Sequence, residues 1–182
     1  MTAIGADWYV GNCHKWLCAP KGCAFLHAQP PAQGGLHPGT ISHGYGLGFL
    51  AEFDWTGTTD PSRFLAVTEA IEFHVRLGGA ALRQRNRLLA ARGAALLARR
   101  LNTQVGTTGP VAGAMATLRL PVEDPTAARA LAIRKQLMEA GTDAPVHALD
   151  GALWLRLSAF AYNELDDYAR LAEVVASVLP RK

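Results

Sequence analysis

The second half of the chain carries a regular series of turn and helix-cap signals, and this series restricts the possible folds more than any other feature. A strand-like apolar segment covers residues 114–120. It is followed by Asp124-Pro125, a pair typical of a helix start, and Gly141 has the position of a helix end. The sequence therefore predicts a strand and then a helix over residues 114–141.

Two further strands and a helix are predicted after residue 141. Residues 144–149 and 152–158 flank Asp150-Gly151, a dipeptide that favours a tight hairpin turn. Asn163 is the predicted cap of a final amphipathic helix. The order β-α-β-β-α is typical of a small α+β domain, in which helices cover one face of an antiparallel sheet.

The first part of the chain begins with two predicted strands. Residues 6–10 are aromatic and β-prone and lead into Gly11-Asn12, a pair suited to a turn. The continuous apolar run over residues 23–28 has the length of a fully buried strand, and it indicates a sheet that is covered on both faces. Residues 29–48 are rich in Pro, Gly and His and are predicted to form a long loop.

Two long helices are predicted next. Asp60 as N-cap and Pro61 at the first helical position start a helix that runs to about residue 77. A second helix follows Gly78-Gly79, with leucines on one stripe and arginines on its other faces, which we interpret as a solvated surface. The leucines are Leu82, Leu89 and Leu96, with Leu88, Leu97 and Leu101 beside them, and the arginines are Arg83, Arg85, Arg87, Arg92, Arg99 and Arg100.

A linker rich in Gly and Thr divides the chain into two parts. It covers residues 103–113 and places a domain boundary near residue 105. We therefore predict an α/β protein with one domain over residues 1–105 and a small C-terminal α+β domain over residues 106–182.

Composition excludes several classes of protein. The 182 residues are 49% hydrophobic and 18% charged, which is typical of a globular chain and not of a disordered one. The net charge of +3 is spread along the sequence, so a nucleic-acid partner is not indicated. We find neither a membrane-spanning apolar run nor a signal sequence, and the expected location is the cytoplasm.

Three cysteines lie close together near the N-terminus. Cys13, Cys18 and Cys23 are odd in number, which is unlike a disulfide framework, and we expect free thiols. His14 lies among them, but the spacing fits a structural zinc site poorly, so no metal is predicted.

The densest group of reactive side chains surrounds Lys15. The segment Gly11-Asn12-Cys13-His14-Lys15-Trp16-Leu17-Cys18-Ala19-Pro20-Lys21-Gly22 places this lysine just beyond a predicted strand and among apolar neighbours. Desolvation there favours a nucleophilic amine that forms a Schiff base. A surface lysine lying over an apolar patch is the alternative.

This segment resembles the cofactor-lysine segment of the class V aminotransferase superfamily, and in particular its isopenicillin N epimerase-like branch. Members of the superfamily use pyridoxal 5′-phosphate. The resemblance implies that Lys15 forms the Schiff base with the cofactor and acts as acid and base. It implies two alternatives for His14, which either assists catalysis or packs against the cofactor ring.

Two further blocks support the same resemblance. The block Phe53-Asp54-Trp55-Thr56-Gly57-Thr58-Thr59-Asp60 contains the Gly57-Thr58 pair, which in this family reaches the cofactor phosphate of the neighbouring subunit. A helix N-terminus after Thr58 also favours an anion, although the same residues fit a plain capping loop. The pair therefore implies a homodimer or a larger homo-oligomer.

The third block places an arginine on a predicted strand. The block Trp154-Leu155-Arg156-Leu157-Ser158-Ala159-Phe160-Ala161-Tyr162-Asn163 is similar to the closing Arg-x-Ser…Tyr-Asn pattern of the family. The resemblance implies that Arg156 binds the α-carboxylate of an amino-acid-like substrate. Alternation with Leu155 and Leu157 turns its guanidinium away from them.

The resemblance covers essentially the whole chain but only the C-terminal half of such enzymes. Residues 1–105 correspond to the end of a sheet in the large cofactor-binding domain, and the expected N-terminal half of the catalytic domain is missing. The implied reaction is of the epimerase, aminotransferase or lyase type, and we expect weak cofactor retention by this chain alone. Residues 142–154 lack the nucleophilic cysteine of cysteine desulfurases, which disfavours desulfuration.

Two other functions remain open at this stage. Thr40-Ile41-Ser42-His43-Gly44 nearly matches the pentapeptide of serine hydrolases, with Ser42 as the nucleophile of an esterase. A non-catalytic remnant that associates with itself is the second alternative, because losing half of a sheet exposes strand edges and apolar faces.

Overall fold

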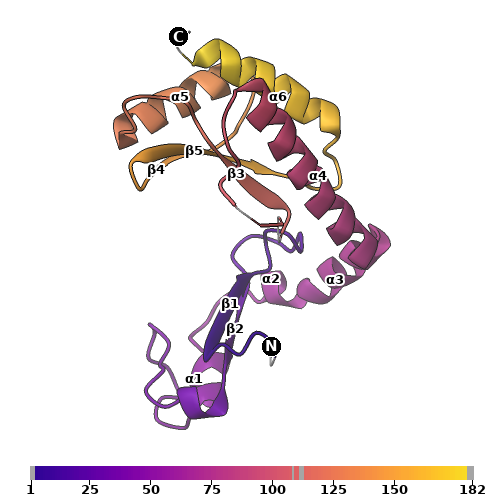
Figure 1. Ribbon diagram of the computed structural model, residues 1–182. Coiled ribbons are helices and arrows are strands. Elements are labelled where there is room, and N and C mark those ends of the chain that lie inside the picture. The colour runs from indigo at the N-terminus through magenta and orange to yellow at the C-terminus, as the bar shows by residue number, and fades with distance from the viewer. Residues whose placement is uncertain (1–2, 108, 111–112, 180–182) are drawn as a thin grey trace. The chain divides into compact units, whose positions relative to one another are not determined.

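A computed structural model describes residues 3–107, 109–110 and 113–179 (Figure 1). The chain divides into two compact units, Met1–Arg76 and Leu77–Lys182. This division lies before the linker predicted near residue 105, because the long helix that precedes the linker packs with the C-terminal elements.

Unit 1 begins with an antiparallel hairpin. Strand β1 (Trp8–Asn12) pairs with β2 (Ala24–Ala28) in the register Trp8↔Ala28 to Asn12↔Ala24. The turn predicted at Gly11-Asn12 is wrong, because both residues belong to β1. Gly11 has a packing role instead, since a Cβ there would lie 2.4 Å from the Phe25 ring. Glycine thus lets the Phe25 ring lie against the opposite strand.

The prediction of a strand buried on both faces does not hold for β2 in the described structure. Only Ala28 of its residues is buried, and Phe25 is 40% exposed. The physical reason is that both faces of the hairpin reach solvent, because consecutive strand residues point to opposite faces and the consecutive residues Trp8 and Tyr9 of β1 are both exposed.

The predicted loop over residues 29–48 is largely confirmed. It contains the short 3-10 helix η1 (Pro30–Ala32) and leads into α1 (Phe49–Asp54), which the sequence did not predict. Within this region Glu52 is buried and binds the His37 ring.

The helix predicted from Pro61 to residue 77 is interrupted. It consists of α2 (Ser62–Leu65) and α3 (Val67–Arg76), with a turn at Ala66. The N-cap of α2 is Pro61, one residue later than the predicted Asp60, although the Asp60 carboxylate still accepts a hydrogen bond of 2.9 Å from the backbone N of Ser62. Hydrogen bonds from Ser62 lower the pKa of this carboxyl.

Unit 2 has the predicted β-α-β-β-α order, preceded by a long helix. Its elements are α4 (Gly79–Arg100), β3 (Met115–Arg119), α5 (Ala127–Glu139), β4 (Val146–Leu149), β5 (Ala152–Ser158) and α6 (Leu165–Val178). The sheet has the order β3-β5-β4 and is antiparallel throughout. Asp150 (φ 49°) and Gly151 (φ 68°) form the hairpin turn predicted between β4 and β5.

One face of this sheet carries the core. Alternate residues of β5, namely Leu153, Leu155 and Leu157, are buried, and Leu118 of β3 is buried with them. Helices α4, α5 and α6 pack on this face (Figure 1). The opposite face of the sheet is open, and burying leucines on the first face is what directs the intervening side chains towards it.

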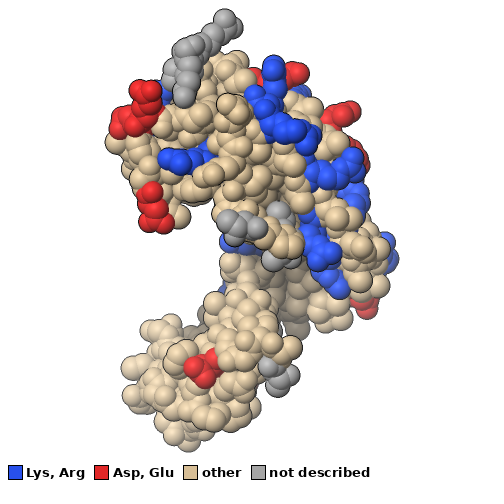
Figure 2. All heavy atoms as spheres, viewed as in Figure 1, with Lys and Arg blue, Asp and Glu red and all other residues tan. Residues whose placement is uncertain are grey.

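The apolar stripe of α4 follows the helical period more closely than predicted. Leu82, Leu89 and Leu97 are buried as expected, whereas Leu88 is 52% exposed and Leu96 is partly buried. The stripe is completed by smaller residues, because Gly93 faces Tyr168 at a distance that leaves no room for a Cβ. The arginines of α4 lie on its outer faces, where Figure 2 shows basic side chains along the helix.

The final helix begins one residue later than predicted. Glu164 is the N-cap of α6 and forms a capping box with Asp167. Asn163 supports this start through its amide, which donates to Asp167 Oδ2 at 3.2 Å, while its own Oδ1 accepts from the backbone N of Phe160 at 3.0 Å. Hydrogen bonds from the Glu164 backbone and Asn163 lower the pKa of the Asp167 carboxyl.

Candidate functional site

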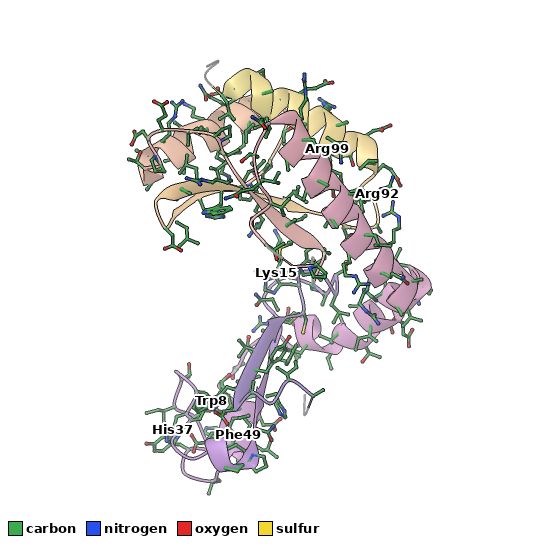
Figure 3. All side chains as sticks on the ribbon, in the orientation of Figure 1. Trp8, Lys15, His37, Phe49, Arg92 and Arg99 are labelled. Atoms are coloured by element: carbon green, nitrogen blue, oxygen red, sulfur yellow. The ribbon has the colours of Figure 1, made fainter. Side chains whose placement is uncertain are left out.

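Lys15 lies in the loop that connects β1 to β2 (Figure 3). Backbone hydrogen bonds give this loop a defined shape: Cys18 N donates to Lys15 O at 3.1 Å, and Ala19 N donates to Cys13 O at 3.0 Å. Cys18 has a φ of 64° and Gly22 a φ of 89°. The loop therefore returns the chain to β2 within a few residues and presents Lys15 at its tip.

The Lys15 side chain is exposed, which differs from the apolar environment predicted for it. Trp16 is 37% exposed, and the buried members of the loop are Cys13, Ala19 and Cys23. Among the residues that the structure describes, none forms a hydrogen bond or an ion pair with the Lys15 amine. The amine is thus available to an electrophile.

His14 is held by the backbone of the opposite strand end. Its Nδ1 lies 3.0 Å from the carbonyl oxygen of Cys23. A carbonyl only accepts, so Nδ1 carries the proton and Nε2 of the neutral ring keeps a lone pair. His14 is partly buried, and this arrangement fixes its ring beside Lys15 in the chain.

Gly57 and Thr58 lie in the loop before α2. Gly57 has a φ of 109°, which favours glycine, and Thr58 is exposed. The predicted anion site at a helix N-terminus is weakened, because α2 has only four residues and a helix that short adds little dipole. Whether this pair contacts a cofactor phosphate stays a prediction.

Arg63 connects the second motif block to the lysine loop, a role that no local sequence pattern indicates. Its Nη2 donates to Thr59 Oγ1 at 3.1 Å, and its Cδ is the atom that a Cβ on Gly22 would meet at 3.3 Å. Its Nε is buried without a hydrogen-bond partner among the described residues. The Arg63 guanidinium is therefore positioned between two segments that the resemblance assigns to the cofactor.

Arg156 lies in the middle of β5, directly opposite Thr117 of β3. It is partly buried, its neighbours Leu155 and Leu157 face the core, and it points to the open face of the sheet. Its Nε is buried and has no hydrogen-bond partner in the described part of the chain. An unpaired guanidinium N–H that is removed from water is suited to a planar anion.

Two further residues define the surroundings of Arg156. Trp154, two positions earlier on β5, donates from Nε1 to the Leu149 carbonyl at 3.2 Å. Gly106 donates to the Thr117 carbonyl at 2.8 Å, and a Cβ on Gly106 would lie 2.3 Å from Thr117 Oγ1. The segment that contains Gly106 thus extends the sheet along the outer edge of β3, next to Thr117, the residue opposite Arg156.

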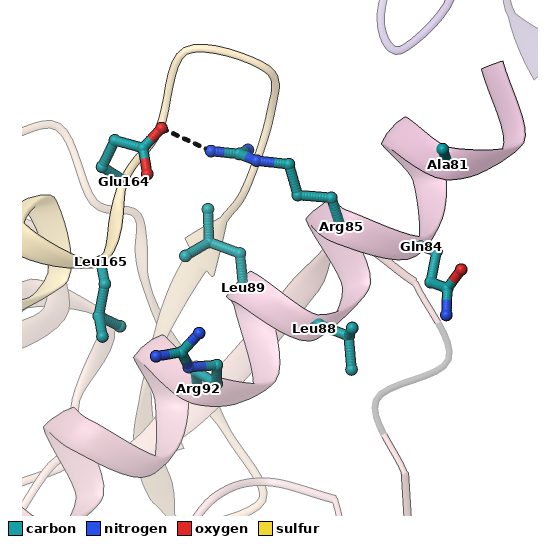
Figure 4. A pocket seen from close by; sticks show the side chains of 8 residues that line it. All are labelled: Ala81, Gln84, Arg85, Leu88, Leu89, Arg92, Glu164 and Leu165. Atoms are coloured by element: carbon teal, nitrogen blue, oxygen red, sulfur yellow. Dashed lines mark hydrogen bonds and ion pairs between the residues drawn. The ribbon is translucent and has the colours of Figure 1, made fainter. Parts of the chain in front are cut away.

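The segment after β5 is held by side chains from two helices. Arg85 of α4 donates to the carbonyls of Phe160 (3.3 Å) and Asn163 (2.8 Å) and pairs with Glu164 at 2.7 Å (Figure 4). Tyr168 of α6 donates from its hydroxyl to the Ser158 carbonyl at 2.7 Å. Arg85 is thus an exception to the predicted solvated arginine face.

The alternative site at Ser42 lacks the geometry of a hydrolase nucleophile. A nucleophile elbow joins a strand to a helix, whereas Ser42 lies in the long loop, where its carbonyl accepts from Tyr45 N at 3.0 Å. The Ser42 hydroxyl has no hydrogen-bond partner among residues 3–107, 109–110 and 113–179.

The described residues contain no group of three or more His, Cys, Asp or Glu side chains arranged to hold a metal ion. They also contain no helix with the length and apolar character needed to cross a bilayer.

Comparison with known proteins shows what this chain is similar to. The chain is 32% identical to a putative L-cysteine desulfhydrase of Oryza sativa, a match that covers 94% of this chain and 40% of the relative. It is 34% identical to isopenicillin N epimerase of Amycolatopsis lactamdurans over 96% of this chain and 48% of the relative. This chain has the C-terminal part of a class V aminotransferase-like fold.

Solved structures agree with this fold. A complex of the cystine C-S lyase C-DES covers 98% of this chain with a TM-score of 0.70 at 18% identity. A cysteine desulfurase from Escherichia coli covers 97% with the same TM-score and identity. No family model matches the chain. The chain spans somewhat less than half the length of these relatives and structures, between 40% and 48%.

Proposed function

We propose that this chain contributes to a pyridoxal-phosphate-dependent enzyme that acts on an amino acid, with Lys15 as the residue that binds the cofactor. The observation that carries the proposal is the position of Lys15 at the tip of the β1–β2 loop, exposed and without an ion-pair partner among the described residues. A free amine is the group that condenses with an aldehyde. Relatives aligned over nearly the whole chain support the same role.

The cofactor, when bound, supplies an electron sink that stabilises negative charge on the substrate α-carbon. The chain supplies the groups around it. Lys15, once its amine is free, is the acid and base that moves a proton at that carbon. His14 supports this role, because the bond from Nδ1 to the Cys23 carbonyl orients the ring and leaves Nε2 as a hydrogen-bond acceptor.

Arg156 is the proposed partner of the substrate carboxylate. Its Nε, which is buried and has no hydrogen-bond partner among the described residues, fits this role because a carboxylate oxygen would satisfy that N–H. Thr117, directly opposite Arg156 on β3, lies beside it on the same face of the sheet.

Gly57 and Thr58 are proposed to bind the phosphate of the cofactor that a neighbouring subunit holds. This role requires a homodimer or a larger homo-oligomer, which is proposed as well. Thr58 is exposed, as a residue that reaches a second chain must be. The unpaired Nε of Arg63, near Gly22 and Thr59, supports an anion in the same region. The proposed location is the cytoplasm.

The substrate is proposed to be an amino acid, and the reaction to be an epimerisation, transfer or elimination. Relatives named as L-cysteine desulfhydrases keep a sulfur-containing amino acid among the candidates, and relatives named as isopenicillin N epimerases keep an epimerisation.

Trapping with borohydride tests the role of Lys15. The chain is incubated with pyridoxal phosphate, reduced with borohydride and digested, and the modified lysine is located by peptide mass spectrometry. We expect the phosphopyridoxyl group on Lys15 at substoichiometric cofactor. Lys15→Ala should lose this label, whereas the control Lys21→Ala, which removes another exposed lysine of the same loop, should retain it. Equal labelling of all four lysines would contradict the proposal.

Self-association without catalysis is the second candidate, and the exposed apolar residues of unit 1 favour it. Trp8, Val10 and Phe25 of the hairpin are 55%, 69% and 40% exposed. Apolar side chains gathered on one small hairpin are typical of an interaction surface. Val10→Ser should shift the chain to a smaller species in sedimentation velocity, and an unchanged distribution would contradict this candidate.

A further inference from the structure

Cys13 and Cys23 occupy opposite positions at the base of the Lys15 loop. The β1–β2 register ends with Asn12↔Ala24, and the next opposite pair is Cys13 and Cys23, joined by a backbone hydrogen bond of 3.1 Å from Cys13 N to Cys23 O. Directly opposite residues of antiparallel strands have Cα atoms about 4.5–5.5 Å apart. Disulfides span Cα separations of about 4.4–6.8 Å, so these two positions satisfy the distance requirement.

The two side chains also pack in one buried cluster. Cys13 and Cys23 belong to it together with Ala19 and Ala70, and Cys23 Sγ donates to the Pro20 carbonyl at 3.1 Å. Both side chains are buried, Cys13 with 7% exposure and Cys23 with none. Their Cβ atoms therefore turn to the same side of the hairpin, which is the second requirement for a disulfide.

The third cysteine differs from this pair. Cys18 is exposed, lies on the outer part of the loop, and has its sulfur 4.0 Å from the Trp16 carbonyl. Ala19, the residue that follows it, is bonded back to Cys13 through the backbone, so Cys18 is directed away from the buried thiols. The loop thus offers one exposed cysteine as an internal control for the buried pair.

We propose that Cys13 and Cys23 form a redox-active dithiol, which a hydroperoxide converts to a disulfide at the base of the Lys15 loop. In the first step a thiolate sulfur attacks the peroxide, the O–O bond breaks, and a sulfenic acid and water form. In the second step the other thiol attacks the sulfenic sulfur, and the S–O bond breaks with release of water. Two thiols and one hydrogen peroxide thus give one disulfide and two waters.

Cys13 is the thiol that attacks the peroxide first, because its side chain retains some exposure while that of Cys23 has none. Burial, together with the neighbouring Cys23 thiol, raises the pKa of the Cys13 thiol. The reactive thiolate is therefore a minor species at neutral pH, and its fraction increases as the pH rises. Oxidation is expected to be slow at neutral pH and faster in alkaline buffer.

The disulfide is connected to Lys15 and its neighbour His14 through one atom, the carbonyl oxygen of Cys23. This oxygen accepts from both Cys13 N and His14 Nδ1, so a covalent bond between Cys13 and Cys23 constrains the ring that precedes Lys15. An effect on cofactor binding rests on the proposed function, whereas the disulfide itself does not.

Peptide mapping tests the proposal, because trypsin separates the three cysteines. Cleavage at lysine and arginine places Cys13 in residues 1–15, Cys18 in residues 16–21 and Cys23 in residues 22–63. After treatment of the full chain with hydrogen peroxide, we expect a linked pair of residues 1–15 and 22–63, a loss of two hydrogens from the intact mass, and full reversal by dithiothreitol.

Three variants serve as controls. Cys18→Ser should retain the linked pair and the mass loss, whereas Cys13→Ser and Cys23→Ser should each abolish the linked pair. A link through residues 16–21, or oxidation of the buried thiols to sulfinic acid without a disulfide, would overturn the proposal, as would the absence of any mass change. Borohydride trapping of pyridoxal phosphate on the reduced and on the oxidised chain is a separate measurement from the mapping of the disulfide. Failure of Lys15 to label in both states would therefore contradict the proposed function and leave the disulfide result standing.

Discussion

His37 Nδ1 lies 2.6 Å from Oε2 of Glu52, whose side chain is buried at the end of the long loop of unit 1. The second carboxylate oxygen of Glu52 accepts from the backbone N of Gly46 at 3.2 Å. A cationic or neutral imidazole and a backbone amide thus hold one carboxylate, and they join residues 37–46 of the loop to α1. This arrangement gives the otherwise irregular loop a fixed point.

The first prediction concerns the pH dependence of this carboxylate. The hydrogen bond from His37 lowers the pKa of Glu52 in the folded chain. The stabilisation is therefore present above the ordinary Glu pKa of about 4.3 and is lost as the pH falls through the lower folded value. Glu52→Gln should lower the unfolding midpoint at pH 7, and the difference from wild type should narrow below about pH 4.

Thermal unfolding followed at several pH values measures this effect. Glu72→Gln is the matched control, because Glu72 forms an exposed i,i+4 pair with Arg76 at 3.7 Å and contributes little. A difference between wild type and Glu52→Gln that stays constant from pH 7 to pH 3 would contradict the assignment.

The second prediction concerns the close approach of Gly106 to β3. A Cβ on Gly106 would lie 2.3 Å from Thr117 Oγ1 and 2.9 Å from the Trp154 ring. Gly106→Ala should therefore destabilise the chain by about 1–3 kcal/mol, the usual cost of overpacking. Gly109→Ala is the control, because no atom lies within 4 Å of a Cβ there. Chemical denaturation measures both variants, and similar losses in the two would refute the steric explanation.

The third prediction concerns the Tyr168 hydroxyl. Removing the hydrogen bond to the Ser158 carbonyl in Tyr168→Phe should cost about 0.5–1.5 kcal/mol. Burial raises the pKa of Tyr168 to about 12, so its stabilising contribution is complete below the ordinary Tyr value of about 10 and is lost as the pH rises through 12. Tyr162→Phe, at an 80% exposed position, should change neither the free energy of unfolding nor its dependence on pH. Urea unfolding at pH 8 and pH 11 separates these outcomes.

The fourth prediction concerns Arg85. Its guanidinium binds two carbonyls and Glu164, but its side chain is 38% exposed and that of Glu164 75%, so solvent screens the ion pair. We expect Arg85→Ala to cost about 1–2 kcal/mol, mainly through the unpaired carbonyls. Hydrogen exchange of residues 160–164 should increase in this variant. Arg87→Ala, an exposed change on the same helix, should leave the exchange unaltered, and equal protection in both variants would count against the assignment.

The architecture of unit 2 was predictable from local sequence signals. Asp150-Gly151 fixes a hairpin because both residues adopt positive φ, and alternation along β5 directs Leu153, Leu155 and Leu157 to one face. Boundaries were less predictable, as at the start of α6. There both Asn163 and Glu164 carry side chains suited to an N-cap. The structure uses Glu164, which forms a capping box with Asp167.

Unit 1 was less predictable because its segments depend on non-local partners. Gly11 is a turn former by composition, yet it lies in a strand because the Phe25 ring needs the space. The apolar run 23–28 indicated burial, but burial requires elements on both faces, and β2 pairs with one strand. The motif around Lys15 identified the candidate site through residue order, while the exposure of the amine depended on the loop conformation.

The sequence by itself determined the class of this protein, since capping pairs, hydrophobic periods and the blocks around Lys15, Thr58 and Arg156 are local patterns. Only the tertiary structure decided which polar atoms are satisfied. In the described part of the chain it left Arg63 Nε and Arg156 Nε buried without hydrogen-bond partners, placed Cys13 opposite Cys23, and brought the Arg85 side chain to the segment after β5. The physical reason is that hydrogen bonding and burial depend on atoms brought together from distant parts of the chain, which no local pattern specifies.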